Sequence, residues 1–118
     1  MDDYQTLDVV EAGDVTIARL RDQRISDGEE LRLLSQELTA LVDLESRNKL
    51  LINLGAVEYL SSSAIGAFIM ARKKARLAGG VVRLCNLHPD IQTMFSITQM
   101  DQLFDIMSSE EDALNAFS

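Results

Sequence analysis

Three consecutive serines, Ser61, Ser62 and Ser63, stand where an apolar run gives way to a pattern of good helix formers. A serine at such a junction can act as a nucleophile, accept a phosphoryl group, or cap the helix by accepting a backbone N–H of its first turn. The surrounding residues determine which of these three kinds of chemistry the site supports.

Hydrolase chemistry finds little support around the serines. A nucleophile of the Gly-x-Ser-x-Gly type needs small residues on both sides of the serine and a histidine base. The positions two before each serine hold Tyr59, Leu60 and Ser61, and the single histidine, His88, directly precedes Pro89. We therefore expect no catalytic residues and no enzyme activity, with His88 in a surface loop.

Metal and cofactor sites are not expected either. No Gly-x-x-x-x-Gly-Lys stretch that would cradle a phosphate is present, and no cysteines or histidines are paired at metal-ligand spacing. The only cysteine, Cys85, lies in the apolar run "GVVRLCNL", which predicts a buried strand. We expect Cys85 to be a core residue, with no cofactor and no metal.

Composition narrows the range of partners. The chain carries 19 Asp and Glu against 11 Lys and Arg, a formal net charge of −8, so its overall field repels nucleic acid. No uncharged apolar run approaches the roughly 20 residues that cross a bilayer, and the chain start lacks the charge and apolar stretch of a secretory signal. We expect a cytoplasmic protein that does not insert into membranes.

The pattern of elements predicts one α/β domain over residues 1–118, in the order ββαβαβαβα. Two β-branched runs joined by Gly13-Asp14 predict an antiparallel hairpin. Ser26, followed three residues later by Glu29, forms a capping-box pattern before an amphipathic helix. The apolar residues of that helix recur at helical spacing, at Leu31, Leu34, Leu38 and Leu41.

A βαβ unit surrounds the serines. The run "KLLINLGAV" predicts a strand buried on both faces, the helix that starts at Ser62 ends at Gly79-Gly80, and "VVRLCNL" predicts a parallel strand. Right-handed crossover chirality places the helix on one face of the sheet.

The C-terminal third predicts two more helices and a strand. Pro89 suits the first turn of a short helix, whose inward residues are Ile91, Met94 and Phe95. A strand near "LFDIM" then leads to a terminal helix that Ser108 or Ser109 would cap. The acidic residues that follow suit the positive end of that helix dipole.

Capping and phosphorylation both remain open for the serine triplet. One serine suffices for a cap, which contributes about 1 kcal/mol. A phosphoryl group adds about −1.5 to −2 charge at a place where the helix presents free N–H groups and a positive dipole. The helix start therefore tolerates the modification, which would change what binds there without unfolding the domain.

The helix after the serines has two distinct faces. At 100° per residue, one predicted buried stripe comprises Ala64, Phe68, Ala71, Ala75 and Ala78. The opposite face comprises Gly66, Ile69, Met70, Lys73 and Leu77. A neighbouring helix that covers this apolar face is the favoured interpretation. The alternative is a partner-binding patch beside Ser62, with Arg72, Lys73 and Arg76 as a positive rim.

Residues 51–114, within a similarity that extends from about Leu7 to Phe117, resemble the STAS domain family, particularly bacterial anti-sigma-factor antagonists. That family carries an Asp-Ser-Ser/Thr-Gly-Leu-Gly motif after a buried strand, then a basic helix, a double glycine, another strand and a proline turn. Ser61 to Gly66 occupy the motif position. The resemblance implies a mixed sheet of about five strands with helices mainly on one face.

The resemblance also implies a function. In the family, a partner anti-sigma factor that is a serine kinase uses ATP to phosphorylate the residue after the motif aspartate, and this releases the partner. The matching residue is Ser62, with Ser61 and Ser63 as less favoured acceptors. Ser61 and Ala64 stand where the motif has aspartate and glycine, and Asn53 stands where many members have an acidic residue.

We therefore expect an interaction switch in signal transduction and transcription regulation. Its predicted partner-binding residues are Ser61, Ser62, Ser63, Gly66, Ile69, Met70 and Lys73. The alternative is a STAS regulatory subunit of a membrane transport complex for lipids or anions, without phosphorylation. Ser61 in place of the motif aspartate is the feature that favours this alternative.

Overall fold

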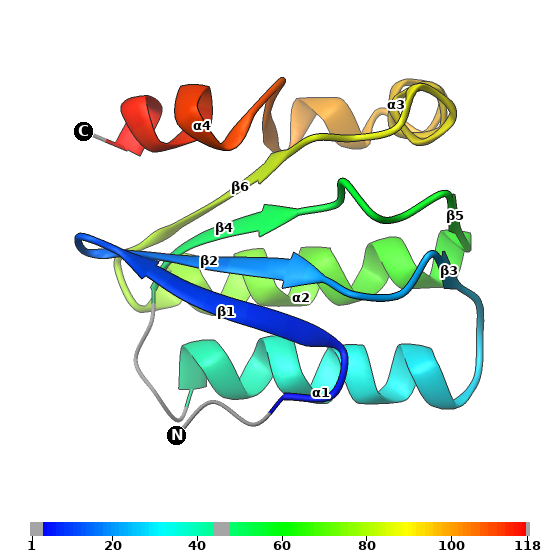
Figure 1. Ribbon diagram of the computed structural model, residues 1–118, viewed down its shortest axis with the longest axis horizontal. Helices are drawn as coiled ribbons and strands as arrows, with labels where there is room; N and C mark the ends of the chain where they lie inside the picture. The colour runs from blue at the N-terminus through cyan, green and yellow to red at the C-terminus, as the bar shows by residue number, and fades with distance from the viewer. Residues whose placement is uncertain (1–3, 44–47, 118) are drawn as a thin grey trace.

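The computed structural model describes residues 4–43 and 48–117. Its main sheet has five strands in the order β1-β2-β4-β6-β7. Their bounds are Leu7–Ala12 (β1), Val15–Leu20 (β2), Lys49–Asn53 (β4), Val81–Cys85 (β6) and Asp105–Met107 (β7). Figure 1 shows α1 (Glu29–Asp43) at the bottom of the view, α2 (Ser62–Leu77) beside it and overlapping β1 and β2, and α4 (Glu110–Phe117) at the top.

The predicted hairpin is confirmed. Strands β1 and β2 pair antiparallel from Leu7↔Leu20 to Ala12↔Val15. Gly13 turns the chain between them with a φ of 64°, which glycine adopts without the strain a side chain would bring. The remaining pairs, β2 with β4, β4 with β6 and β6 with β7, are all parallel, so the sheet is mixed as expected.

Strand β4 is buried on both faces, as its apolar run predicts. Leu50 and Ile52 belong to the main core beneath the sheet, whereas Leu51 belongs to a smaller cluster on the other face. The strand ends at Asn53, earlier than the predicted run through Val57, and Leu54 and Val57 continue into the core from a turn.

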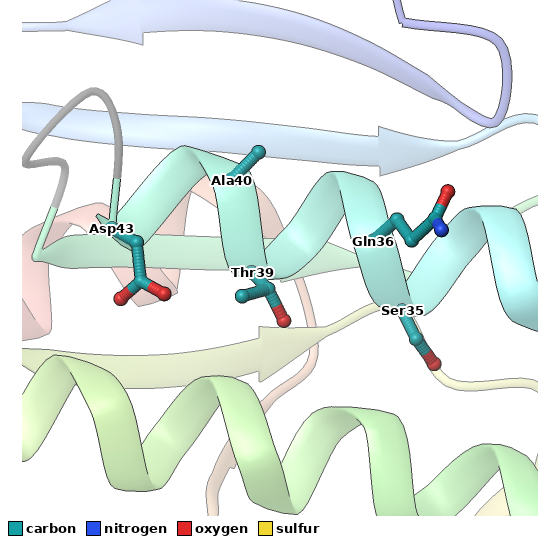
Figure 2. Close-up of a pocket in the computed structure, with 5 residues that line it drawn as sticks. All are labelled: Ser35, Gln36, Thr39, Ala40 and Asp43. Atoms are coloured by element: carbon teal, nitrogen blue, oxygen red, sulfur yellow. The ribbon is translucent and has the colours of Figure 1, made fainter.

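Helix α1 begins later than the capping-box pattern predicts. Glu29, expected as the third helical residue, is the first, and the carbonyl O of Gly28 accepts the N–H of Arg32. Gly28 has a φ of 112°, so the chain turns there and Ser26 precedes the cap position. The prediction that Ser26 caps α1 is therefore wrong. Figure 2 shows five residues on successive turns of α1 that line a shallow hollow of about 420 Å³.

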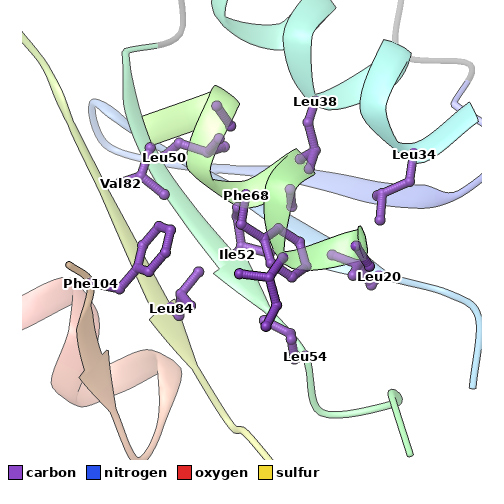
Figure 3. Close-up of a cluster of buried hydrophobic side chains, with 14 of the residues drawn as sticks. Leu20, Leu34, Leu38, Leu50, Ile52, Leu54, Phe68, Val82, Leu84 and Phe104 are labelled. Atoms are coloured by element: carbon purple, nitrogen blue, oxygen red, sulfur yellow. The ribbon is translucent and has the colours of Figure 1, made fainter. Parts of the chain in front are cut away.

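The main core lies between the sheet and the helices beneath it. Figure 3 shows Leu34 and Leu38 of α1 and Phe68 of α2 meeting the inward residues of β2, β4 and β6. The buried stripe predicted for α2 is confirmed at Ala64, Phe68, Ala71 and Ala75. Its last member, Ala78, is exposed instead, because α2 ends at Leu77 and Ala78 is its C-cap.

Helix α3 (Pro89–Ile97) begins at Pro89 as predicted, and Ile91 and Phe95 are buried. Met94, expected to point inward, is only partly buried. A short 3-10 turn, η1 (Met100–Gln102), then leads to β7.

Helix α4 packs Ala113 on Leu51 and Cys85 across the second face of the sheet. Ser109 caps α4 by accepting the N–H of Asp112 at 3.1 Å, as predicted.

A second sheet was not predicted. It contains only β3 (Arg24–Ile25) and β5 (Tyr59–Leu60), which pair in parallel. The carbonyl O of Gln23 also accepts the N–H groups of Glu58 and Tyr59. This small ladder joins the loop before α1 to the segment before the serines. Among residues 4–43 and 48–117, no helix has the length and apolar character needed to cross a membrane.

Candidate functional site

The N-terminal end of α2 is held by Ser61. This residue is the N-cap, with an extended backbone at φ −73° and ψ 157°. Its Oγ accepts the N–H of Ala64 at 3.3 Å, and its own N–H donates to the carbonyl O of Ile25 at 2.9 Å. The β3–β5 ladder and the cap thus fix where the helix starts.

Asp27 contributes a carboxylate to this end of α2. The Ser61 Oγ–H donates to Asp27 Oδ1 at 3.0 Å, from the loop that leads into α1. Ser61 stands where the family motif has its aspartate. In this chain the carboxylate beside the serines is that of Asp27, which comes from elsewhere in the sequence. No local sequence pattern marks Asp27 as part of this site, because its contact with Ser61 spans 34 residues.

Ser62 and Ser63 are the first two residues of α2, and both are exposed. Within the described part of the chain, neither hydroxyl has a hydrogen-bond partner. The first turn of α2 carries no acidic residue, so the positive end of its dipole is not neutralised from within the helix. The structure thus separates the roles that the sequence left open: Ser61 caps, whereas Ser62 and Ser63 present free hydroxyls.

Ser62 lines a groove of about 370 Å³, which we call the serine-end groove. Its apolar walls are Tyr59, Ile91 and Met94, and Glu58 and Asp90 supply acidic groups. The ring of Tyr59, whose residue is 42% exposed, is held by the Arg24 guanidinium 4.6 Å from its centroid. The incomplete burial of Met94 follows from its place in this groove.

The outer face of α2 is open. Gly66, Met70, Lys73 and Leu77 are exposed, with exposed fractions of 47% for Met70 and 84% for Leu77. The interpretation that a neighbouring helix covers this face is therefore wrong. Helix α1 packs along a different side of α2, where Lys74 Nζ meets Asp43 Oδ2 at 2.9 Å. Ile69 alone is half-buried and packs against the core.

The predicted positive rim does not lie around the serines. Arg72 and Arg76 line a separate groove next to β6 and β7, and only Lys73 shares the open face of α2 with Met70. The hollow along α1 in Figure 2 is lined by uncharged residues and Asp43, and Asp43 is already paired with Lys74.

A polar network that the sequence analysis missed joins α4 to the sheet. Arg19 donates from Nε and Nη2 to the two carboxylate oxygens of Glu110, at 2.7 and 2.8 Å. Asn53 Nδ2 also donates to Glu110 Oε2, at 2.5 Å, and Asn53 Oδ1 accepts the N–H of Gly55 at 2.7 Å. The hydrogen bonds from Arg19, and next the one from Asn53, lower the pKa of Glu110 against the opposing effect of its burial.

The cysteine and the histidine of the chain, the other two reactive side chains, lie outside the serine-end groove. Cys85 is buried, as predicted, and burial, with a smaller contribution from Glu110, raises the pKa of its thiol to about 12. His88 is exposed, as predicted, and its Nδ1 accepts the N–H of Asp90 at 3.4 Å at the start of α3. Within the described ranges, no three His, Cys, Asp or Glu side chains gather in a way that could hold a metal ion.

The fold and the position of the serines agree with a known family. A family model described as STAS domain matches residues 7–113. This chain belongs to the STAS domain family. The resemblance predicted from the motif is confirmed, and residues 61–66 of this STAS domain form the cap and first turn of α2.

Individual relatives carry more specific names. The chain is 32% identical over 84 residues to BtrV of Bordetella bronchiseptica, named as a candidate anti-sigma factor antagonist, covering 71% of this chain and 72% of BtrV. A structure of an anti-sigma-factor antagonist (STAS) domain protein from Planctomyces limnophilus matches with a TM-score of 0.81 and 25% identity, covering 93% of this chain and 96% of that one.

A third similarity concerns the fold alone. The phosphorylated form of the Bacillus cell fate determinant SpoIIAA matches with a TM-score of 0.72 at 12% identity, over 95% of this chain and 99% of that one. The described part of this chain, with its mixed five-stranded sheet, therefore shares its overall fold with that protein.

Proposed function

We propose that this protein is an anti-sigma-factor antagonist, which binds an anti-sigma factor with serine kinase activity through the serine end of α2. Phosphorylation of Ser62 would control the binding. The observation that supports this most directly is the exposed hydroxyl of Ser62, which has no partner among the described residues and borders the serine-end groove. BtrV carries the name of this class of protein.

The geometry favours Ser62 over its neighbours as the acceptor. The Ser61 hydroxyl is engaged by both the helix cap and Asp27, so a phosphoryl group on Ser61 would break two contacts. Ser62 is free, and it lines the groove, whereas Ser63 does not. A partner that fills the groove would therefore meet the Ser62 side chain directly.

A phosphate on Ser62 would oppose docking for a physical reason. The groove already holds the carboxylates of Glu58 and Asp90 beside apolar walls. A phosphoryl group adds about −1.5 to −2 charge at this place, and a partner that covers it must desolvate that charge. Binding through Tyr59, Ile91 and Met94 would lose affinity, while the fold stays intact because the hydroxyl makes no internal contact.

The test compares Ser62→Ala and Ser62→Asp with the unmodified chain, for binding to purified anti-sigma factors from the same genome by calorimetry. We expect Ser62→Ala to bind like the unmodified chain and Ser62→Asp to bind at least about tenfold more weakly. The matched pair Ser63→Ala and Ser63→Asp, one residue further along α2, controls for charge at the helix start.

Three results would contradict the proposal. Equal binding of all the Ser62 variants would remove the switch, and the absence of binding to any anti-sigma factor would remove the partner. A loss that is as large in Ser63→Asp as in Ser62→Asp would show a general effect of charge rather than a specific acceptor.

A further inference from the structure

A second groove, of about 470 Å³, lies at the opposite end of α2 from the serines. The residues that matter for its chemistry are Arg72, Arg76, Val82, Gln102, Leu103 and Asp105. One wall is the C-terminal half of α2, and the other is the segment from η1 to β7. We call it the arginine groove.

The two arginines of this groove lack counter-charges. Arg72 and Arg76 are four residues apart on α2, so their guanidinium groups project to the same side of the helix and repel each other. Within residues 4–43 and 48–117, no carboxylate lies at salt-bridge distance from either one. The acid of the groove, Asp105, is paired with Arg83 at 3.4 Å.

The dipole of α2 does not account for both arginines. Cations are favoured in the last turn of a helix, which here contains Lys74 and Arg76. Arg72 lies before that turn, yet it lines the same hollow as Arg76. In a chain with a net charge of −8, two unpaired guanidinium groups in one concavity form a local positive site.

The floor of the groove is an incompletely paired strand. The ladder between β6 and β7 begins at Arg83↔Asp105, so Val81 and Val82 extend beyond the end of β7. The N–H of Val81 donates to the carbonyl O of Asn48, on the β4 side. Backbone N–H groups alternate along a strand, so the N–H of Val82 points the other way, toward the groove.

We propose that the arginine groove is a docking site for an extended, acidic segment of a partner protein. Arg72 and Arg76 lie about 6 Å apart along the helix axis, and alternate side chains of an extended strand lie about 6.8 Å apart, so two carboxylates in such a segment match the two arginines. Leu103, 38% exposed, offers apolar contact to such a segment.

This site is independent of the serine end. Ten residues of helix separate Ser62 from Arg72, or roughly 15 Å. A segment in the arginine groove therefore binds whether or not Ser62 is phosphorylated. The net charge of the chain excludes nucleic acid as the occupant, since a long polyphosphate would meet the acidic remainder of the surface.

The test uses the full chain, labelled with nitrogen-15, and a short capped peptide of alternating glutamate and valine, followed by NMR. We expect the amide signals of Val82 and Leu103 and the side-chain Nε signals of Arg72 and Arg76 to shift together. The double variant Arg72→Gln, Arg76→Gln should bind about tenfold more weakly, and added salt should weaken binding to the unmodified chain.

The matched control is Arg21→Gln with Arg32→Gln, which removes the same charge at other exposed ion pairs and should leave binding unchanged. Equal loss in both double variants would overturn the proposal, as would equal binding of a peptide with glutamine in place of glutamate, or no binding at all. If inorganic phosphate alone produced the same shifts at the same concentrations, the groove would be a small-anion site instead.

Discussion

Ser61 and Ser63 lie two positions apart at the start of α2, yet only Ser61 accepts a backbone N–H, from Ala64. Replacing Ser61 with alanine should therefore lower the free energy of unfolding by about 1 kcal/mol, since the cap is lost. Ser63→Ala should change it by less than about 0.5 kcal/mol. Urea unfolding of both variants measures this difference, and equal effects would show that Ser61 is not the functional cap.

Asn53 is a second residue whose identity follows from its contacts. Its amide donates to Glu110 while its carbonyl oxygen accepts the N–H of Gly55, so both ends of the side chain are used. Asn53→Asp would keep the second contact but place a carboxylate against the carboxylate of Glu110. We expect a loss of about 1 kcal/mol in the free energy of unfolding at neutral pH.

The test of this prediction follows that variant as pH falls. Protonation relieves the repulsion between the two carboxylates, so the deficit of Asn53→Asp should shrink in acid. A deficit that stays constant from neutral pH to about pH 3 would show that packing, and not charge, disfavours aspartate at this position.

At the scale of elements, Glu110 attaches α4 to the sheet. The hydrogen bonds from Arg19 lower its pKa below the ordinary value of 4.5. A carboxylate whose pKa is lowered on folding stabilises the fold at pH values above its ordinary, unfolded-state pKa. This stabilisation is lost as the pH falls through the folded-state pKa. Because Arg19 is about half exposed, solvent screens the pair and its contribution is about 1 kcal/mol or less.

Glu110→Gln should therefore destabilise the protein at neutral pH by up to about 1 kcal/mol, and the difference should be lost at an acid pH below the folded-state pKa of Glu110. Glu111→Gln is the matched control: this exposed residue occupies the same first turn of α4, so the two variants lose the same dipole interaction. Urea unfolding at both pH values is the measurement. If the two variants lose equal stability, the Arg19 and Asn53 contacts do not hold α4.

At the scale of the whole molecule, the sequence predicted what depends on local pattern. Gly13-Asp14 between β-branched runs predicted the hairpin, and the continuous apolar run predicted that β4 is buried on both faces. Both predictions succeed because turn preference and side-chain periodicity depend on residues close together in the sequence. The serine triplet at a strand-to-helix junction predicted where α2 starts, and left open which serine caps it and which could be modified. The mixed sheet of about five strands was predicted from the family resemblance.

What the sequence did not predict depends on contacts between distant residues. Asp27 reaches Ser61 across 34 positions, and Arg19 reaches Glu110 across 91, so neither pair has a local signature. Strands β3 and β5 have two residues each, too short for any period to show. For the outer face of α2 the favoured interpretation, a covering helix, was wrong and the alternative, an open face, was right, because apolar residues such as Met70 and Leu77 indicate burial unless the position of neighbouring helices is known.

Of the three serines at the start of α2, we expect a partner kinase to modify Ser62. The most direct test incubates the chain with a cognate anti-sigma kinase and ATP, and maps the phosphate by mass spectrometry of the peptides. We expect one phosphate, on Ser62, and none in Ser62→Ala even though Ser61 and Ser63 remain. Phosphate on Ser61 or Ser63 in the unmodified chain, or no phosphate with a kinase that binds it, would contradict the account.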